Sequence, residues 1–266
     1  MSDLPFISRQ ERLPSVGSTN DVVRAWLDDG TPEVCLAVAD EQTAGRGRDG
    51  RRWQAPPGAA LLTSLGFRPT WLDPDRTWRL AAITSLAMAD AAEEVAGLKD
   101  QSVRLKWPND LVIEADGQVR KLGGVLGETA GLGGRDPRAI IGLGINVDWL
   151  AEDFPAELAG SMTSLRVASS RPVELPDLFA AFIDRVETRT IALRAGHFDV
   201  ADWTSRQLTS GRPVRLDLPD GSSLDTRALG VDTGSGGLVI EDLAAPAGER
   251  TILTGEIQHL RLSVGV

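Results

Sequence analysis

Cysteine, histidine and tyrosine are nearly or wholly missing from this 266-residue sequence. Cys35 is the only cysteine, so no intramolecular disulfide can form, and the apolar residues around it are typical of a buried side chain in a strand. A thiol nucleophile needs a nearby base, but the only histidines, His197 and His259, lie far along the chain. Cysteine–histidine catalysis and histidine-ligated metal sites are therefore disfavoured.

Long apolar runs are missing as well. No stretch approaches the roughly 20 apolar residues that a membrane helix requires, and residues 1–12 lack the apolar core of a secretory signal. We therefore expect a cytoplasmic protein without a membrane partner. The net charge of −10 disfavours a protein that binds the nucleic-acid backbone, since such proteins usually present a basic surface.

Lysine is scarce among the 28 basic residues, because only Lys99, Lys106 and Lys121 are lysines. Where an arginine-rich chain retains lysine, the position favours a compact ammonium over a planar guanidinium. Lys106 and Lys121 fall inside the motifs described below, which makes both candidate functional residues.

The pattern of apolar residues predicts an α+β protein. Helical spacing predicts helices at residues 19–29, 78–96, 175–194 and 198–208. Buried or alternating runs predict strands at residues 34–39, 59–67, 103–107, 111–114, 121–129 and 139–147. After residue 210 the pattern changes to short alternating strands, at residues 214–218, 225–231, 238–240 and 251–262. We therefore expect a larger domain at residues 1–209 and a small β-barrel at residues 210–266.

Residues 41–53, Glu-Gln-Thr-Ala-Gly-Arg-Gly-Arg-Asp-Gly-Arg-Arg-Trp, are rich in glycine and arginine. Glycine lets the backbone approach a ligand, and the guanidinium fork suits carboxylate and phosphate oxygens. This Gly/Arg loop therefore predicts a site for an anionic ligand. It lacks the ending of a Walker A loop, and no helix is expected after it, as a dinucleotide fingerprint would require. A solvated basic turn and an RNA-binding segment are the alternatives.

Three further segments combine strands with lysine or glycine. Residues 104–111, Arg-Leu-Lys-Trp-Pro-Asn-Asp-Leu, place Lys106 at the end of a strand and before a turn. Such a lysine needs an anionic partner unless its ammonium reaches solvent. Residues 121–128 and 141–147 are strands with internal glycine, which often marks the close approach of a ligand or of another backbone segment.

The order of these motifs is more informative than any one of them. Ser-Thr-Asn at residues 18–20, the Gly/Arg loop, Lys-Trp-Pro-Asn-Asp, Lys-Leu-Gly-Gly-Val-Leu and Gly-Leu-Gly-Ile-Asn-Val follow one another. The series closely resembles the biotin–protein ligase family over residues 16–150. The resemblance implies a mixed β-sheet flanked by helices, of the class II synthetase-like type shared by biotin and lipoate ligases, followed by a small SH3-like β-barrel.

The resemblance also implies a reaction. Biotin would react with ATP to give biotinyl-5′-AMP and pyrophosphate, and biotin would then pass to a lysine of a biotin carboxyl carrier domain. Mg²⁺ would screen the leaving pyrophosphate. Lys106 and Arg48 are the expected catalytic residues, because fixed positive charge offsets the repulsion between a carboxylate and a phosphate.

The remaining site residues follow from the same resemblance. Those expected to bind biotin are Ser18, Thr19, Asn20, Gln42, Gly45, Arg46, Gly47, Arg48, Lys106, Gly124 and Gly144. Those expected to bind ATP are Arg48, Arg51, Trp53, Lys106, Lys121 and Asn146. The ureido group of biotin is neutral, and it needs the neutral donors and acceptors that serine, threonine and glutamine provide.

Two features depart from the family pattern. Asp49 stands where many members carry a third basic residue, a change that bears on the electrostatics of the loop and on formation of a homodimer. Some members begin with a DNA-binding helix-turn-helix domain, whereas 17 residues precede Ser18 here, so we expect no DNA binding.

Three alternative functions remain at this point. A lipoate–protein ligase shares the architecture, but the dithiolane of lipoate needs no ureido-binding set. A non-catalytic sensor of biotin or nucleotide would not need both Lys106 and Arg48. An RNA-binding protein would need aromatic stacking platforms, and aromatic residues make up only 5% of the chain.

The scarcity of lysine leads to a first prediction. A ligase that activates biotin should label its own amines little, since only three lysines are present. Mass spectrometry of the protein after incubation with biotin, ATP and Mg²⁺ should show little self-biotinylation. Heavy labelling of the lysines would contradict this expectation.

Overall fold

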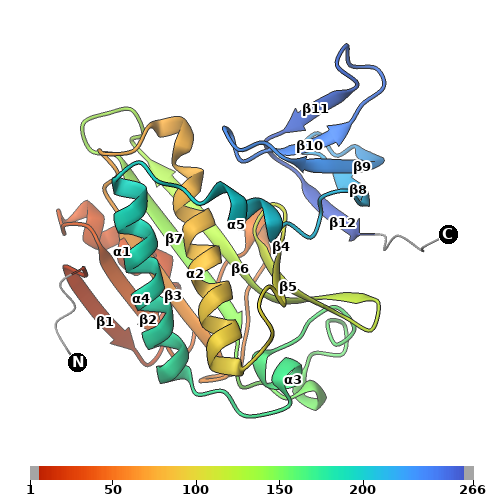
Figure 1. Ribbon diagram of the computed structural model, residues 1–266. Helices are drawn as coiled ribbons and strands as arrows, with labels where there is room; N and C mark the ends of the chain where they lie inside the picture. Colours follow the sequence, from red (N-terminus) through yellow and green to blue (C-terminus); the bar gives the residue numbers. More distant parts are fainter. Residues whose placement is uncertain (1–5, 261–266) are drawn as a thin grey trace.

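A seven-stranded mixed sheet forms the centre of the larger part of the molecule (Figure 1). The computed structural model describes residues 6–260. The strand order is β1-β2-β3-β7-β6-β5-β4. The strands are β1 (Arg9–Leu13), β2 (Cys35–Ala39), β3 (Ala60–Phe67), β4 (Val103–Lys106), β5 (Asp110–Ala115), β6 (Gln118–Ala130) and β7 (Arg138–Asn146). β1 and β2 pair in parallel, and the other neighbours pair antiparallel.

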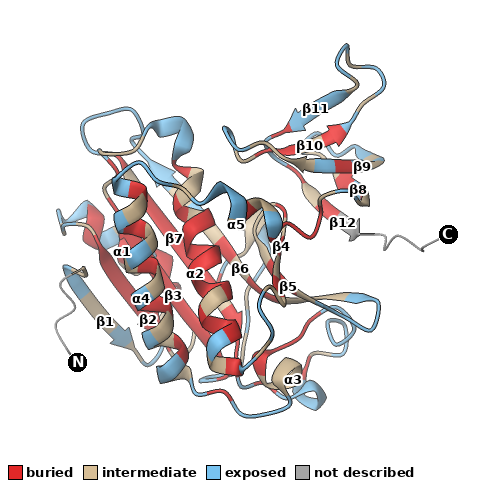
Figure 2. Ribbon diagram, viewed as in Figure 1, coloured by how far each residue is buried: buried red, intermediate tan, exposed pale blue. Residues whose placement is uncertain are grey.

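Helices cover the two faces of this sheet unequally. The long helices α2 (Trp78–Ala96) and α4 (Leu175–Arg194) lie side by side on one face (Figure 1). α2 is rich in alanine and largely buried (Figure 2), because its small side chains allow close packing against the sheet and α4. The short helix α1 (Thr19–Asp28) packs on the other face, where it contacts Cys35 and Ala37 of β2. Leu36 and Val38, which alternate with them, belong to the core under α2.

The C-terminal part forms a second, antiparallel sheet of five strands, drawn in blue in Figure 1. Its strands are β8 (Pro213–Asp217), β9 (Ser223–Val231), β10 (Leu238–Glu241), β11 (Glu249–Ile252) and β12 (Glu256–Leu260), in the order β11-β10-β9-β8-β12. The arrangement is consistent with an SH3-like domain. In the described residues no pairing of β11 with β12 closes it into a barrel. The domain boundary after residue 209 stays a prediction.

Most elements predicted from the sequence are confirmed, and α2 and α4 have the predicted bounds. The prediction of a helix at residues 198–208 was too long, since α5 spans only Val200–Ser205. The prediction of one strand at residues 251–262 was wrong. The chain leaves β11, turns and enters β12, while residues 261 and 262 lie outside the described part. A Cβ at Gly255, between the two strands, would lie 2.9 Å from the Asp217 carbonyl oxygen.

Two elements had not been predicted. β1 has the polar sequence Arg-Gln-Glu-Arg-Leu, and it escapes the apolar pattern because it lies at the edge of the sheet. The short helix α3 (Leu165–Ser169) begins at Ser164, whose side-chain oxygen accepts a hydrogen bond from the Val167 amide.

Trp107, directly after β4, joins the two sheets. Its side chain is 4% exposed and packs in the hydrophobic core of the second sheet, with Leu216 and Ile257 among others. Its indole Nε1 donates a hydrogen bond to the Gly236 carbonyl oxygen at 3.1 Å. The position of the turn after β4 therefore depends on the second sheet.

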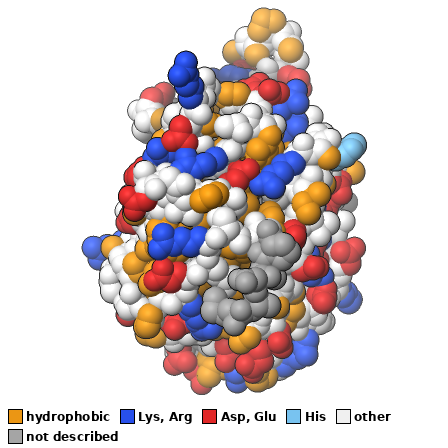
Figure 3. Space-filling model, turned by 90° about the vertical axis from the view of Figure 1, so that its left-hand side faces the viewer, with side chains coloured by type: hydrophobic (Ala, Val, Ile, Leu, Met, Phe, Trp, Pro, Cys, Tyr) orange, Lys and Arg blue, Asp and Glu red, His pale blue; other side chains and the backbone are white. Residues whose placement is uncertain are grey.

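Neither the helices in the described part of the chain nor the face shown in Figure 3 has the features of a membrane-spanning or nucleic-acid-binding protein. Within residues 6–260, no helix combines the length and the apolar character needed to cross a bilayer. On the face drawn in Figure 3, basic and acidic side chains are interspersed.

A buried ion-pair network holds the helices against β4. Arg206 is 2% exposed and donates hydrogen bonds to Glu93 at 2.9 Å, Asp90 at 2.6 Å and Asp202 at 3.0 Å. Burial opposes the charged guanidinium, but the bond to Glu93 and the nearby carboxylates outweigh this effect and raise the pKa of Arg206. Glu93 also accepts a hydrogen bond from the Val103 amide at 2.8 Å.

This network predicts unequal effects for two neighbouring glutamates. Glu93→Gln should lower the free energy of unfolding by about 2–4 kcal/mol, because it removes one carboxylate from a buried cation. Glu94→Gln is the matched control, since Glu94 is 62% exposed and pairs with Arg185, and it should cost about 0.5 kcal/mol or less. Urea denaturation followed by circular dichroism measures both, and equal losses would contradict the assignment.

Candidate active site

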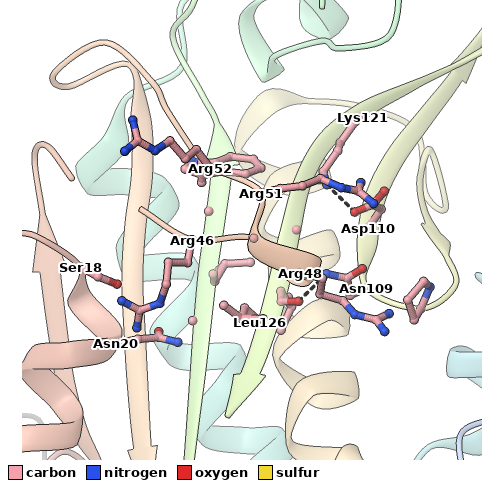
Figure 4. Close-up of a pocket in the computed structure, with 18 of the residues that line it drawn as sticks. Ser18, Asn20, Arg46, Arg48, Arg51, Arg52, Asn109, Asp110, Lys121 and Leu126 are labelled. Atoms are coloured by element: carbon pink, nitrogen blue, oxygen red, sulfur yellow. Dashed lines mark hydrogen bonds and ion pairs between the residues drawn. The ribbon is translucent and has the colours of Figure 1, made fainter. Parts of the chain in front are cut away.

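A pocket lies on the α1 face of the seven-stranded sheet, beside the Gly/Arg loop (Figure 4). All the residues that the sequence predicted for the site line this pocket, except Gly45 and Asn146. Those that line it are Ser18, Thr19, Asn20, Gln42, Arg46, Gly47, Arg48, Arg51, Trp53, Lys106, Lys121, Gly124 and Gly144. Segments far apart in the sequence are thus brought to one site.

One end of the pocket is built from neutral hydrogen-bonding groups. Gln42 Oε1 accepts hydrogen bonds from the Thr19 amide at 2.7 Å and from Thr19 Oγ1 at 2.9 Å. Ser64 Oγ of β3 lies 2.7 Å from Thr19 Oγ1 and 2.6 Å from Asn20 Oδ1. Ser18, Thr19 and Asn20 are buried although they are polar. These bonds fix the polar atoms at the start of α1 in one arrangement.

Two glycines of β7 allow residues that line the pocket to pack directly against the strand backbone. A Cβ at Gly142 would lie 2.3 Å from Asn20 Oδ1, and a Cβ at Gly144 would lie 2.7 Å from the indole ring of Trp53. Residues two apart in a strand share a face, so Gly142 and Gly144 both face the pocket. Leu143 between them also belongs to the core under α2.

The Gly/Arg loop forms a flap between the two sheets. It contains a short 3₁₀ turn at Arg48–Gly50, and a Cβ at Gly45 would lie 2.5 Å from the Trp53 carbonyl oxygen, so Gly45 allows the loop to close on itself. Arg48 Nη1 donates to the Gly255 carbonyl oxygen at 3.4 Å, and Arg51 forms an ion pair with Glu256. Figure 4 shows Arg46 beside Asn20, with Arg48 and Arg51 toward the other end of the pocket.

The other end of the pocket is cationic. Lys121 Nζ pairs with Asp110 Oδ1 at 2.5 Å and lies 5.7 Å from the centre of the Trp53 ring. Lys106 has no ion pair within the described residues. Burial lowers the pKa of Lys106, Asp110 opposes this effect, and the charges of Lys121 and Arg51 add to it. This end is therefore poised to attract an anion.

Two predicted residues do not line the pocket. Asn146 is 3% exposed, and its Nδ2 donates to the Thr163 carbonyl oxygen at 2.9 Å, so it fixes the segment that follows β7. Gly45 serves the shape of the loop.

Sequence reasoning missed several lining residues, among them Thr63, Asn109, Asp110, Leu126, Gly142 and Glu256. Asn109, Asp110 and Gly142 stand inside the recognised motifs, which was a usable signal. Glu256 comes from the second sheet and had no such signal. In the described residues, no group of His, Cys, Asp and Glu side chains is arranged to hold a metal ion.

A neutral hydrogen-bonding end joined to a cationic end defines a site for a small ligand with a polar head and an acidic tail, of the kind found in acid-activating ligases. The model of the Biotin/lipoate A/B protein ligase family matches residues 13–146, and the chain belongs to this family.

Individual relatives agree with this assignment. The chain is 31% identical over 257 residues to the biotin–acetyl-CoA-carboxylase ligase of Mycobacterium tuberculosis, with 94% of this chain and 88% of that protein covered. It is 32% identical over 219 residues to the bifunctional ligase/repressor BirA of Bacillus spizizenii, of which it spans 65%. The biotin protein ligase from Aquifex aeolicus in complex with biotin and ATP superposes with a TM-score of 0.76 at 26% identity, over 96% of this chain and 99% of that one.

The environment of Lys106 predicts its titration. Its pKa should lie below the usual value for lysine of about 10.4, because burial disfavours the ammonium. Reductive methylation with ¹³C-formaldehyde gives few lysine signals in a chain with three lysines, and NMR can follow each with pH. Lys106→Arg assigns the signal, and a titration at or above the usual value would contradict the prediction.

Proposed function

We propose that this protein is a biotin–protein ligase, which converts biotin and ATP to biotinyl-5′-AMP and pyrophosphate and then transfers biotin to a lysine of a biotin carboxyl carrier domain. The single observation that carries the proposal is the polarity of the pocket. Buried neutral groups form one end, where Arg46 is paired with Asp21, and Lys106, Lys121, Arg48 and Arg51 form the other. The similarity to the biotin–acetyl-CoA-carboxylase ligase of Mycobacterium tuberculosis and to the biotin protein ligase from Aquifex aeolicus supports it.

The polarity supports one orientation of biotin in the pocket. The ureido group is a neutral cyclic urea, and it matches the ordered set of Ser18, Thr19 and Gln42. The valerate carboxylate would then reach toward Lys106 and Lys121. A lipoate tail offers the same carboxylate, but its dithiolane cannot make the hydrogen bonds that a ureido group would make at the other end, and each polar group there that loses water without gaining a partner costs about 1–3 kcal/mol. The pocket therefore favours biotin.

In the first half-reaction a biotin carboxylate oxygen attacks the α-phosphorus of ATP. A new P–O bond forms, the bond to the bridging oxygen breaks, and the electron pair leaves with pyrophosphate. Lys106 and Arg48 offset the repulsion between the two anions by position and charge. Mg²⁺ bound to the phosphates of ATP would neutralise the leaving pyrophosphate. Arg51, Trp53 and Lys121 would contact the nucleotide.

In the second half-reaction the neutral amine of the acceptor lysine attacks the acyl carbon of the adenylate. The C–N bond forms and Lys106 stabilises the oxyanion. The bond from the acyl carbon to the phosphate oxygen then breaks, AMP leaves with the electron pair, and the amine proton is released to solvent. The flap formed by the Gly/Arg loop would keep water from the mixed anhydride. We propose that these steps take place in the cytoplasm, and the net charge of −10 favours a protein acceptor over DNA.

Pyrophosphate release tests the proposal directly. With ATP and Mg²⁺ present, release should depend on biotin and not on lipoate, and Lys106→Ala should lower its rate about 100-fold through loss of fixed charge. Release with lipoate alone would make the protein a lipoate ligase. No release with either acid would leave a binding protein on a ligase fold.

The close approach at β7 predicts the effect of a single methyl group. Gly142→Ala should weaken biotin binding at least tenfold, because its Cβ would lie 2.3 Å from Asn20 Oδ1 and must displace the start of α1. Gly127→Ala is the control, since a Cβ at this position would make an ordinary van der Waals contact, with Ile141 Cδ1 at 3.7 Å. Isothermal titration calorimetry measures both, and equal affinities would rule out this role for Gly142.

A further inference from the structure

From Gly45 onward, arginine side chains are the main polar contacts between the Gly/Arg loop and the rest of the protein. At the start of the loop, the Thr43 and Ala44 amides donate to the carbonyl oxygens of Val16 and Gly17. From Gly45 to Trp53 the backbone hydrogen bonds in the described residues join the loop to itself. A loop of this kind opens and closes as a unit, and the contacts of its side chains decide which state is favoured.

Arg46 makes the contact that ties the loop to α1. Its Nη1 and Nη2 donate to the two carboxylate oxygens of Asp21, each at 2.7 Å. This paired geometry is the strongest form of an arginine–carboxylate contact. Hydrogen bonding between the two side chains lowers the pKa of Asp21 and raises that of Arg46.

Glu128 of β6 extends this contact into a ring of four charged groups. It lies 3.6 Å from Arg46 Nη2 and accepts a hydrogen bond from Arg24 at 2.8 Å, and Arg24 in turn pairs with Asp21. A network that contains one bidentate pair stabilises more than an isolated surface pair does, because each side chain is already restrained by the others.

The same carboxylate reaches the neutral end of the pocket. Glu128 Oε2 accepts a hydrogen bond from Asn20 Nδ2 at 2.6 Å, while Asn20 Oδ1 lies 2.6 Å from Ser64 Oγ. Continuous hydrogen bonds therefore lead from Arg46 on the loop, through Asp21, Arg24 and Glu128, to Asn20 at the neutral end.

We infer that Asp21 and Glu128 are positioning residues that hold the Gly/Arg loop closed through Arg46 and couple its closure to the orientation of Asn20. Neither carboxylate needs to touch a ligand for this role. The identity of the ligand that the loop covers rests on the proposed function, whereas the inference that these contacts hold the loop closed does not.

Limited trypsin digestion of the ligand-free protein tests the closure. The loop offers cleavage sites at Arg46, Arg48, Arg51 and Arg52. Their side chains are partly exposed in the closed loop, but trypsin binds an extended stretch of backbone, so cleavage is faster when the loop opens. Asp21→Asn should raise the cleavage rate there about threefold to tenfold, the range expected for a partly exposed bidentate pair. High salt should raise the wild-type rate toward that of the variant, since exposed ion pairs are screened.

Three companion variants separate positioning from loss of structure. Asp28→Asn removes another arginine contact of α1, the pair with Arg138, and should leave cleavage of the loop unchanged. Asp21→Glu keeps the charge and should restore most of the wild-type resistance. Glu128→Gln keeps an acceptor for Asn20 but loses the ion pairs, and should also speed cleavage of the loop. Equal cleavage in wild type, Asp21→Asn and Asp28→Asn would overturn the inference.

A second readout connects the closure to the reaction. Biotinyl-5′-AMP formed on the enzyme should escape about threefold to tenfold faster from Asp21→Asn than from wild type. A wild-type protein that forms no adenylate would refute the proposed function while digestion still reports on closure. Adenylate that forms but escapes at equal rates would refute the positioning role.

Discussion

The pocket depends on the absence of side chains at Gly142 and Gly144. A methyl group at either position would collide with Asn20 or Trp53, which both line the site. Because side chains alternate along a strand, the same stretch of β7 offers bare backbone to the pocket and Leu143 to the core. A short Gly-Leu-Gly sequence thus satisfies packing and binding together. The neutral groups at the start of α1 and the indole ring of Trp53 near the cationic end both pack against this strand.

The second sheet contributes residues to the pocket in addition to packing beside it. Trp107 sits in the core of that sheet, although it belongs to the Lys-Trp-Pro-Asn-Asp motif that carries Lys106 and Asp110. Glu256 and the Gly255 carbonyl oxygen contact arginines of the Gly/Arg loop from the same side. The cationic end therefore includes residues from both sheets. The residues of the neutral end all come from the larger, N-terminal part of the chain. A change in the packing between the two sheets would therefore alter the positions of Lys106 and the loop more than those of the residues at the neutral end.

Much of the fold followed from the sequence, for reasons specific to its elements. The bounds of α2 and α4 were predicted to the residue, because the apolar residues recur at helical spacing over a long segment and the residues at the helix ends are typical of helix ends. β1 was missed because an edge strand needs no apolar face, and the break between β11 and β12 was missed because Gly255 was not recognised as part of a turn. Most predicted site residues share one pocket because they stand in contiguous motifs. Ser64, Asp21 and Glu128 were not predicted, since an isolated polar residue acquires its role only from neighbours brought in by the fold.

The central claim is that one pocket holds biotin at its neutral end and the nucleotide at its cationic end, so that an adenylate forms and is kept for transfer. The most direct measurement is to incubate the protein with biotin, Mg²⁺ and α-³²P-labelled ATP, remove free nucleotide by gel filtration, and then add a biotin carboxyl carrier domain. The account predicts labelled biotinyl-5′-AMP that elutes with the protein and is converted to AMP as the carrier becomes biotinylated. Absence of bound adenylate, or adenylate that is hydrolysed while the carrier stays unmodified, would contradict it.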